Sequence, residues 1–264
     1  MWLDEERPVL KRELLLDKPF VNASGTLGFA PEPRLAPALR GLGAFITNPI
    51  SRAPRVPAAN RAVIPFLGGF LLHSGYPNPG ITRVISHFRQ RWAAAPLPVI
   101  VHLLVETPAD IAEMLPKLEG LENILAVELG LPPDCHPDLL AALFEAGYGE
   151  LPLVPCVSPE QVPVLLGVLT GLGPAAVHLV EPRGALPGGD GEIIPGRLYG
   201  PAIFPVMLRA ARVLVTAGLR VIANGGVTAR WQVDALLETG VLAVGLGSAL
   251  WGIDQGMRLL SAEP

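Results

Sequence analysis

Residues 221–251, VIANGGVTARWQVDALLETGVLAVGLGSALW, constrain the fold of this chain more than any other segment. An apolar run, a glycine pair and an amphipathic stretch follow one another, and a second apolar run then leads into a second glycine turn. This order predicts strand, turn, helix, strand, turn and helix. Glycine turns that open directly into helices present free amide groups to an anion. In a (β/α)8 barrel the loops after strands seven and eight commonly hold a phosphate.

We therefore predict a (β/α)8 TIM barrel with a phosphate site at these two turns; alternatively, the glycines only close tight turns between strand and helix. The rest of the chain repeats the alternation of short apolar runs and helical patterns, and its 264 residues suit one barrel domain over residues 1–264. Strands are expected at residues 20–22, 44–47, 99–103, 124–129, 153–157, 176–180, 220–223 and 243–246. Helices are expected at residues 34–40, 81–92, 109–118, 138–146, 161–170, 202–215, 229–238 and from about 249.

Two connections, residues 48–79 after the second strand and residues 181–201 after the sixth, are too long to be plain turns. Both leave the carboxyl ends of strands, the face where a barrel carries its active site. Long ordered insertions at such a place usually serve function. We expect a small hairpin or lid in the first connection. In the second we expect a lid with glycines at positions 188, 189 and 191.

Composition narrows the possible function classes. The net charge is −4 and the basic residues are scattered, which predicts no nucleic-acid partner. No apolar run has membrane-spanning length, and the charged start of the chain does not resemble a signal peptide, so we expect no membrane contact and a cytoplasmic protein. The two cysteines form no disulfide framework. Hydrophobic residues make up 50% and charged residues 17%, which favours a homo-oligomer that buries part of its surface.

Six segments along nearly the whole chain carry motifs that also occur together, and in the same order, in one known family. The segments are residues 22–29, 42–47, 78–80, 196–203, 224–227 and 244–249. In these segments the chain resembles the dihydroorotate dehydrogenases, and the similarity is greatest to the soluble class that works with FMN. The resemblance implies a (β/α)8 barrel that oxidises dihydroorotate to orotate in pyrimidine (UMP) biosynthesis, usually as a homodimer.

The resemblance also implies where FMN and substrate would bind. Two sets of residues would contact FMN, one holding its phosphate and one lying near its isoalloxazine ring. The first set is Gly225, Gly226, Gly247 and Ser248, and the second is Ala23, Ser24 and Gly25; Gly200 is a further cofactor-binding position. On the substrate side the matching positions are Asn48, His73 and Asn78, of which Asn78 keeps the residue that the family has.

Several family positions carry other residues in this chain. A family lysine after strand two falls at Asn48, and a second, on strand five, falls at Cys156. Substrate-binding asparagines fall at His73, His102, Gly130 and Glu181. The active-site base, a Cys or Ser in the loop after strand four, falls at Pro133.

Oxidation of dihydroorotate needs a base and a nearby cation. Cys135 becomes the candidate base if the loop is shifted by two residues relative to the alignment that puts the base at Pro133. Alternatively, it is an inert small residue. The three lysines of the chain lie away from the expected site. Arg52, Arg183 and Arg197, in the two long connections, are candidate cations; alternatively, they are solvated loop residues.

His102, Cys156 and Glu181 should point inward at strand ends if the alternation of the strands holds. One interpretation is an acid/base pair of His102 with Glu181. Another is a metal site of these three residues, but no ligand-spacing motif supports it and we assign no metal from the sequence. A third is that they only fill space. His178 differs in parity from Glu181, so it should face the helices.

Three classes of function remain open. The first is an FMN-dependent oxidoreductase of the dihydroorotate dehydrogenase type, acting on dihydroorotate or another small-molecule substrate. The second is a divergent member of the family that binds FMN or another phosphorylated ligand without orotate chemistry. The third is a barrel that serves as a non-catalytic assembly partner, for which the apolar composition is the hint.

Overall fold

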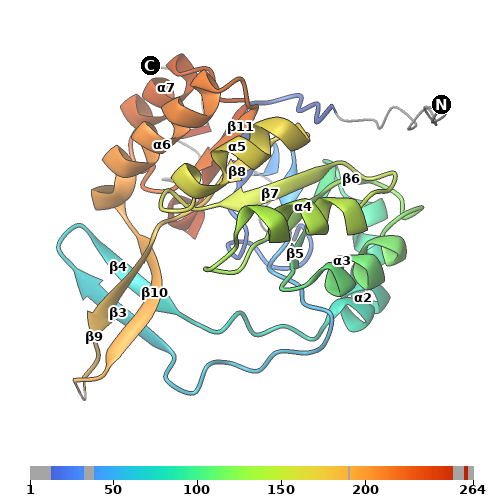
Figure 1. Cartoon of the computed structure of the whole chain (residues 1–264), viewed down its shortest axis with the longest axis horizontal. Coiled ribbons are helices and arrows are strands. Elements are labelled where there is room, and N and C mark those ends of the chain that lie inside the picture. The colour runs from blue at the N-terminus through green and yellow to red at the C-terminus, as the bar shows by residue number, and fades with distance from the viewer. Residues whose placement is uncertain (1–12, 33–38, 190, 252–258, 261–264) are drawn as a thin grey trace.

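The computed structural model describes residues 13–32, 39–189, 191–251 and 259–260. Eight parallel strands form one sheet in the order β1-β12-β11-β8-β7-β6-β5-β2. A parallel bridge between Val21 and Ala44 brings the first and last of these strands together, so the sheet closes into a barrel. Helices stand between successive strands and surround the barrel (Figure 1). The fold is therefore the predicted (β/α)8 TIM barrel.

The eight barrel strands agree closely with the expected ranges. They are β1 (Phe20–Asn22), β2 (Phe45–Ile46), β5 (Val99–Leu104), β6 (Ile124–Gly130), β7 (Leu153–Val157), β8 (Val177–Leu179), β11 (Val221–Asn224) and β12 (Ala243–Leu246).

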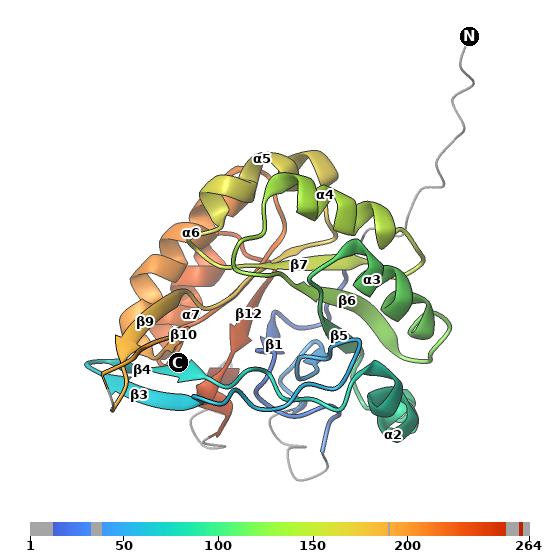
Figure 2. The same ribbon diagram turned by 60° about the horizontal axis from the view of Figure 1, so that its bottom comes forward.

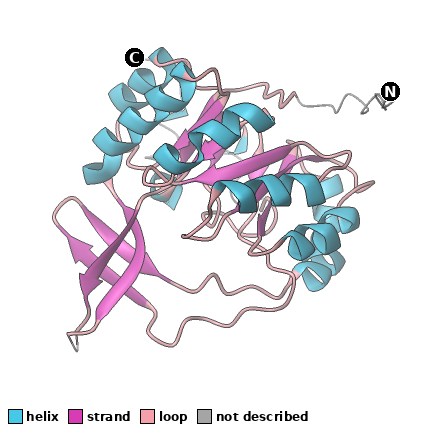
Figure 3. Ribbon diagram, viewed as in Figure 1, coloured by secondary structure: helices cyan, strands magenta, loops and turns pink. Residues whose placement is uncertain are grey.

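The helices lie on the outside of the barrel (Figure 3). The α-helices are α2 (Ile81–Ala93), α3 (Pro108–Met114), α4 (Pro137–Ala146), α5 (Val162–Leu172), α6 (Phe204–Thr216) and α7 (Arg230–Glu238). Short 3-10 turns are η2 (Leu115–Lys117), η3 (Pro201–Ile203) and η4 (Ser248–Trp251). The helix expected at 34–40 lies almost wholly outside the described residues, and so does most of the last helix beyond η4.

Proline and polar residues at helix starts explain several of these boundaries. α3 begins with a proline at its first position behind a capping box of Thr107 and Asp110, whose carboxylate accepts from the Thr107 amide at 2.9 Å. α4 also begins with a proline, and the His136 side chain accepts from the Leu139 amide at 3.2 Å. Within the described residues no helix is long and apolar enough to cross a membrane.

The two long connections form a second, antiparallel sheet. β3 (Ala62–Phe66) and β4 (Gly69–His73) come from the first connection, while β9 (Arg183–Pro187) and β10 (Ile193–Tyr199) come from the second. The strand order is β3-β4-β10-β9, so β4 and β10 join the two connections into one unit. This sheet lies to one side of the barrel (Figures 1 and 2). The pairing explains how residues more than 100 positions apart meet in one place.

The interior of the barrel has two chemically different layers. The layer nearer the amino ends of the strands is aliphatic and fully buried, with Ile100, Ala126, Val154, Ala176 and Ile222. Two positions further along each of these strands the inward residue is polar. These polar residues are His102, Glu128, Cys156, His178 and Asn224. A polar layer at the carboxyl ends is what a barrel active site requires.

Candidate functional site

A cavity of about 440 Å³ opens between the carboxyl ends of the barrel strands and the small sheet. This volume lies in the usual range for small-molecule sites. Its lining comes from both parts, with His102 and Cys156 from the barrel and His73, Arg183 and Arg197 from the small sheet. The insertions therefore build one wall of the candidate site.

A smaller depression adjoins the cavity where the two glycine turns meet. It is lined by Gly225, Gly226, Gly247 and Ser248, the four residues that the resemblance assigns to the phosphate, and also by Gly200, and we call it the glycine cup. Among the hydrogen bonds of the described residues outside helices and strands, none uses the amide of Gly226, Val227 or Gly247 as donor. Free amides at such turns are the groups that hold anions.

Gly226 must be glycine for the fold as well. Its φ of +75° lies in the left-handed region, and a Cβ there would meet the Phe204 amide nitrogen at 2.7 Å. Gly247 differs, because a Cβ at that position would have only ordinary contacts, the closest at 3.7 Å from Ala23 Cβ. Substitution should therefore strain the backbone at Gly226 but not at Gly247.

Glu181, Tyr199 and Asn224 line both the cavity and the glycine cup, so the two spaces adjoin. Asn224 Nδ2 donates to Glu181 Oε1 at 2.9 Å, while the buried Asn224 Oδ1 has no partner among the described residues. Ser24 also lines the cavity and donates its hydroxyl to the Thr47 carbonyl at 3.2 Å. Its neighbours Ala23 and Gly25 are not in the cavity lining.

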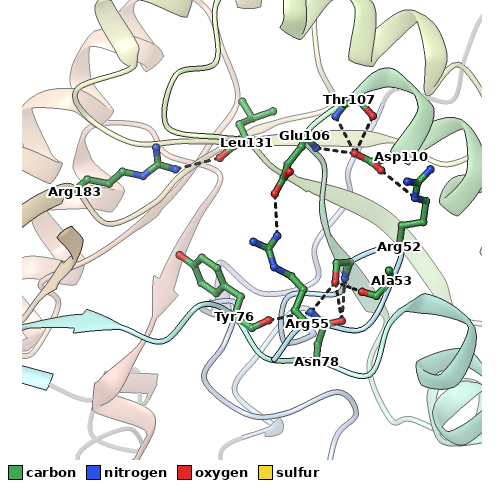
Figure 4. Close-up of polar contacts among 11 residues, drawn as sticks. Arg52, Ala53, Arg55, Tyr76, Asn78, Glu106, Thr107, Asp110, Leu131 and Arg183 are labelled. Atoms are coloured by element: carbon green, nitrogen blue, oxygen red, sulfur yellow. Dashed lines mark hydrogen bonds and ion pairs between the residues drawn. The ribbon is translucent and has the colours of Figure 1, made fainter. Parts of the chain in front are cut away.

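Two arginines bring positive charge to the cavity. Arg197 donates to the Tyr76 hydroxyl and to the Glu181 carbonyl, both at 2.7 Å. Burial alone would lower the pKa of Arg197, but Tyr76 and Glu181 raise it above its usual value. Arg183 donates to the Leu131 carbonyl at 3.1 Å (Figure 4), and its buried Nη1 has no partner within the described residues. An unpaired guanidinium nitrogen at a cavity wall is suited to an anionic ligand.

Burial and the charge of Arg197 both lower the pKa of Arg183. Arg55 also lines the cavity, but it pairs with Glu106 at 3.0 Å (Figure 4). Arg52, the third predicted cation, is absent from the cavity lining and contacts Asp110 at 3.3 Å on the surface.

The polar layer of the barrel contains a hydrogen-bonded chain that runs from β5 through β6 to β8. Glu128 on β6 is fully buried and is joined through Oε2 to His102 Nδ1 at 2.9 Å and through Oε1 to His178 Nδ1. The prediction that His178 faces the helices is therefore wrong. β8 ends at Leu179, so counting parity back from Glu181 crossed the end of the strand.

Burial alone would raise the pKa of Glu128, but His178 and His102 together lower it to about 2. The ionised carboxylate can only accept, so both histidines donate from Nδ1. Glu128 was missed in the sequence, although it is the one charged residue in the apolar run ILAVELG and has the inward parity of Ala126.

Cys156 lies beside this chain. Its sulfur is 3.7 Å from Glu128 Oε2 and 3.8 Å from His102 Nδ1. Burial, followed by the negative charge of Glu128, raises the pKa of the Cys156 thiol well above its ordinary value. The structure thus brings His102 and Cys156 together as expected, but their hydrogen-bonded carboxylate is Glu128, while Glu181 bonds to Asn224.

Comparison with known proteins shows what the chain is similar to. No protein-family model matches the chain. Catalytic subunits of dihydroorotate dehydrogenase B (NAD(+)) are similar to it. The protein of Desulforudis audaxviator is 29% identical over 262 residues, and that of Latilactobacillus sakei is 29% identical over 270 residues. That of Pelobacter propionicus is 28% identical over 267 residues, and each alignment covers 89% of this chain and 84% of the relative. The chain is a distant relative of the dihydroorotate dehydrogenases.

The positions that the sequence resemblance assigns to substrate binding differ in their surroundings. His73 lines the cavity. Asn78 does not, because its amide is used in the loop: Oδ1 accepts from the amides of Ser51 and Gly80, and Nδ2 donates to the Tyr76 carbonyl at 3.0 Å (Figure 4). Asn48 is also outside the lining, and its Oδ1 accepts from the Gly28 amide at 3.1 Å.

The candidate base Cys135 lies outside the cavity lining, while its neighbour Pro133 is part of it. Cys135 is 5% exposed and belongs to the apolar core. Burial, with a smaller effect of Asp134, raises the pKa of this thiol to about 11. A thiol with such a pKa is a poor proton acceptor near neutral pH.

Proposed function

We propose that this chain is an FMN-dependent oxidoreductase of the dihydroorotate dehydrogenase type that acts on a small anionic substrate. The observation that carries the proposal is that the glycine cup adjoins the cavity. The glycine cup, with its free amides, opens beside a cavity of about 440 Å³ whose far wall presents Arg183 and Arg197. A phosphorylated cofactor and a carboxylate substrate could thus lie side by side.

The residues present fit FMN. The amides of Gly226, Val227 and Gly247 are free to hold a phosphate, and Ser248 begins the 3-10 turn η4, whose first amides have no partner within the turn. The unpartnered Asn224 Oδ1 is a further polar contact beside the cup. Ala23, Ser24 and Gly25, at the carboxyl end of β1, would lie near the ring system. FMN bound there would supply a two-electron acceptor.

The cavity residues have distinct roles in this proposal. Arg183 Nη1 would bind a substrate carboxylate, with Arg197 held in place by Tyr76 and by the Glu181 carbonyl. His73 is a further substrate contact. His102 and Glu181, both nearly buried in the cavity wall, are the candidate proton acceptors, and Cys135 is a weaker one because of its raised pKa.

The relatives are named as dihydroorotate dehydrogenases, and the corresponding reaction here would be the oxidation of dihydroorotate to orotate in pyrimidine biosynthesis. A cytoplasmic protein would suit this reaction. The relatives are also named as catalytic subunits, which supports a chain that works within an assembly. A homodimer is the simplest form, and exposed Val63 and Leu67 on the small sheet supply apolar surface for it.

A second candidate function is a divergent member that binds FMN or another phosphorylated ligand without orotate chemistry, or a barrel that serves only as an assembly partner. It is favoured by three departures from the family. Pro133, in the cavity lining, stands at the family's base position, and the two family lysines are replaced by Cys156, also in the lining, and by Asn48, outside it. The two candidates share the glycine cup and differ in turnover.

The deciding experiment is the visible absorption spectrum of the purified protein, repeated after FMN has been added and the protein has passed through gel filtration. The proposal predicts a retained flavin band that dihydroorotate or another carboxylate reductant bleaches under anaerobic conditions. A flavin band that no such reductant bleaches would support the binding protein. A colourless protein that takes up no FMN would refute the proposed cofactor.

A further inference from the structure

Three side chains from adjacent barrel strands bring a nitrogen, an oxygen and a sulfur donor to one point. His102 on β5, Glu128 on β6 and Cys156 on β7 are all buried, and their donor atoms lie within 4.8 Å of one another. The separations are 2.9 Å from His102 Nδ1 to Glu128 Oε2, 3.7 Å from that oxygen to the Cys156 sulfur and 3.8 Å from the sulfur to His102 Nδ1. We propose that these residues form a binding site for a divalent transition metal, with Zn²⁺ as the preferred ion.

The spacing of the donors fits tetrahedral coordination. Zinc bonds of about 2.0–2.2 Å to nitrogen and oxygen and about 2.3 Å to sulfur put neighbouring ligand atoms roughly 3.3–3.6 Å apart. Two of the three observed separations are slightly longer than this and the third is shorter because it is a hydrogen bond. A shift of a few tenths of an ångström in each side chain would therefore accommodate the ion.

The surroundings supply a second layer of contacts of the kind that metal sites have. The other carboxylate oxygen of Glu128 is bonded to His178 Nδ1, and ligating carboxylates are usually oriented by such partners. His102 and Cys156 line the cavity while Glu128 does not, so an ion held by the three would be reachable from the cavity side. Three protein ligands with access for water or substrate is the arrangement of catalytic zinc sites.

The chemistry of the donors selects the ion. Imidazole and thiolate favour zinc and its neighbours, whereas calcium and magnesium take oxygen ligands. Binding would release the thiol proton of Cys156 to solvent, and the His102 proton would move from Nδ1 to Nε2, so uptake of Zn²⁺ would release about one proton. None of the site's residues belongs to the glycine cup, so binding of the ion can be measured with and without FMN. With the ion on His102 Nδ1, Nε2 would carry the ring proton, and Glu181 would be the remaining proton acceptor in the cavity.

Co²⁺ is the probe for the test, because a cobalt–thiolate bond gives a near-ultraviolet charge-transfer band. The chain has two cysteines, so in a Cys135→Ser variant any such band must come from Cys156. After treatment with a chelator, wild type and Cys135→Ser should each bind one Co²⁺ and show the band. Zn²⁺ should displace the cobalt, and the Cys156→Ser variant should lack the band.

Metal content by mass spectrometry gives a second readout that a bound flavin does not affect. The His178→Gln variant should bind Zn²⁺ roughly 10–100-fold more weakly than wild type, since His178 acts on the ion only through Glu128. Absence of the band from folded Cys135→Ser, or binding of far less than one Zn²⁺ per wild-type chain, would overturn the proposal. Flavin content is measured separately on the same samples, so the metal site and the proposed cofactor succeed or fail independently.

Discussion

The glycine cup is tested most cleanly by replacing Gly247 with aspartate, with asparagine at the same position as the matched control. Gly247 has no positive φ, and a Cβ there would lie 3.7 Å from Ala23 Cβ, 3.8 Å from Glu181 Oε1 and 3.9 Å from Asn224 Oδ1. The Cβ of either side chain would therefore make only ordinary contacts at this position. Because they have nearly the same shape, the difference between the two variants reports the effect of charge.

The magnitude follows from Coulomb's law. A carboxylate about 5 Å from a phosphate, at an effective dielectric constant of about 20, costs about 3 kcal/mol per unit of phosphate charge. This corresponds to a loss of affinity of more than about 100-fold for Gly247→Asp relative to Gly247→Asn. The Kd of FMN, measured by fluorescence titration at fixed ionic strength, gives the comparison. Thermal unfolding without ligand checks that both variants are folded.

Glu181 provides the converse experiment. Its carboxylate already lines the cup, so Glu181→Gln should tighten FMN binding while the Asn224 contact is kept. Equal FMN affinity in Gly247→Asp and Gly247→Asn would refute the phosphate assignment. Looser FMN binding in Glu181→Gln would show that this carboxylate contributes more by its contacts than by its charge.

Three further predictions concern the fold, the cavity and Cys135. Gly226→Ala should lower the free energy of unfolding, measured in urea, by about 2 kcal/mol or more, because Gly226 has a positive φ and a Cβ there would contact Phe204. Gly167, on the exposed face of α5, has open space around it, so Gly167→Ala should raise the free energy of unfolding by about 0.5–1 kcal/mol. Equal effects of the two substitutions would contradict this reasoning. Arg183→Gln should weaken orotate binding at least about tenfold in calorimetry, with the fold unchanged, and unaltered affinity would exclude Arg183 as the anion contact. Because the pKa of Cys135 is about 11, about 0.1% of this thiol is ionised at pH 8. The rate of its alkylation, measured by mass spectrometry, should therefore be low at pH 8 and rise about tenfold per pH unit up to pH 10. Rapid labelling of Cys135 at pH 7 would contradict the raised pKa.

Much of the fold was predictable from the sequence because local patterns agree with one another. Each barrel strand is a short apolar run, and glycine turns precede the two helical segments near the end of the chain. Helix starts carry prolines, which the first turn tolerates. The ends of β8 were harder to predict, because a strand of three residues is too short to show an alternating pattern. The wrong prediction for the direction of His178 followed from this.

The candidate site was predictable only in part. Gly225, Gly226, Gly247 and Ser248 come together because each glycine turn directly follows one of two adjacent strands, β11 and β12, whereas Gly200 reaches the cup from the end of β10. Asn78 could not be judged from the sequence, because the loop hydrogen bonds that occupy its amide depend on Ser51, 27 positions away. The position of Cys135 outside the cavity could not be judged from the sequence either, because its burial depends on packing against other elements.

Local residue order was sufficient to infer the strand order, the glycine turns and the kinship with dihydroorotate dehydrogenases, because these depend on neighbours along the chain. The contacts of Glu128 with His102 and His178, and the cavity wall made by pairing β4 with β10, depend on strand register across the barrel and between two distant insertions. A single strand does not specify the register of its partners. The barrel could therefore be predicted from the order of residues along the chain, whereas the contacts within the site depend on how distant segments pack together.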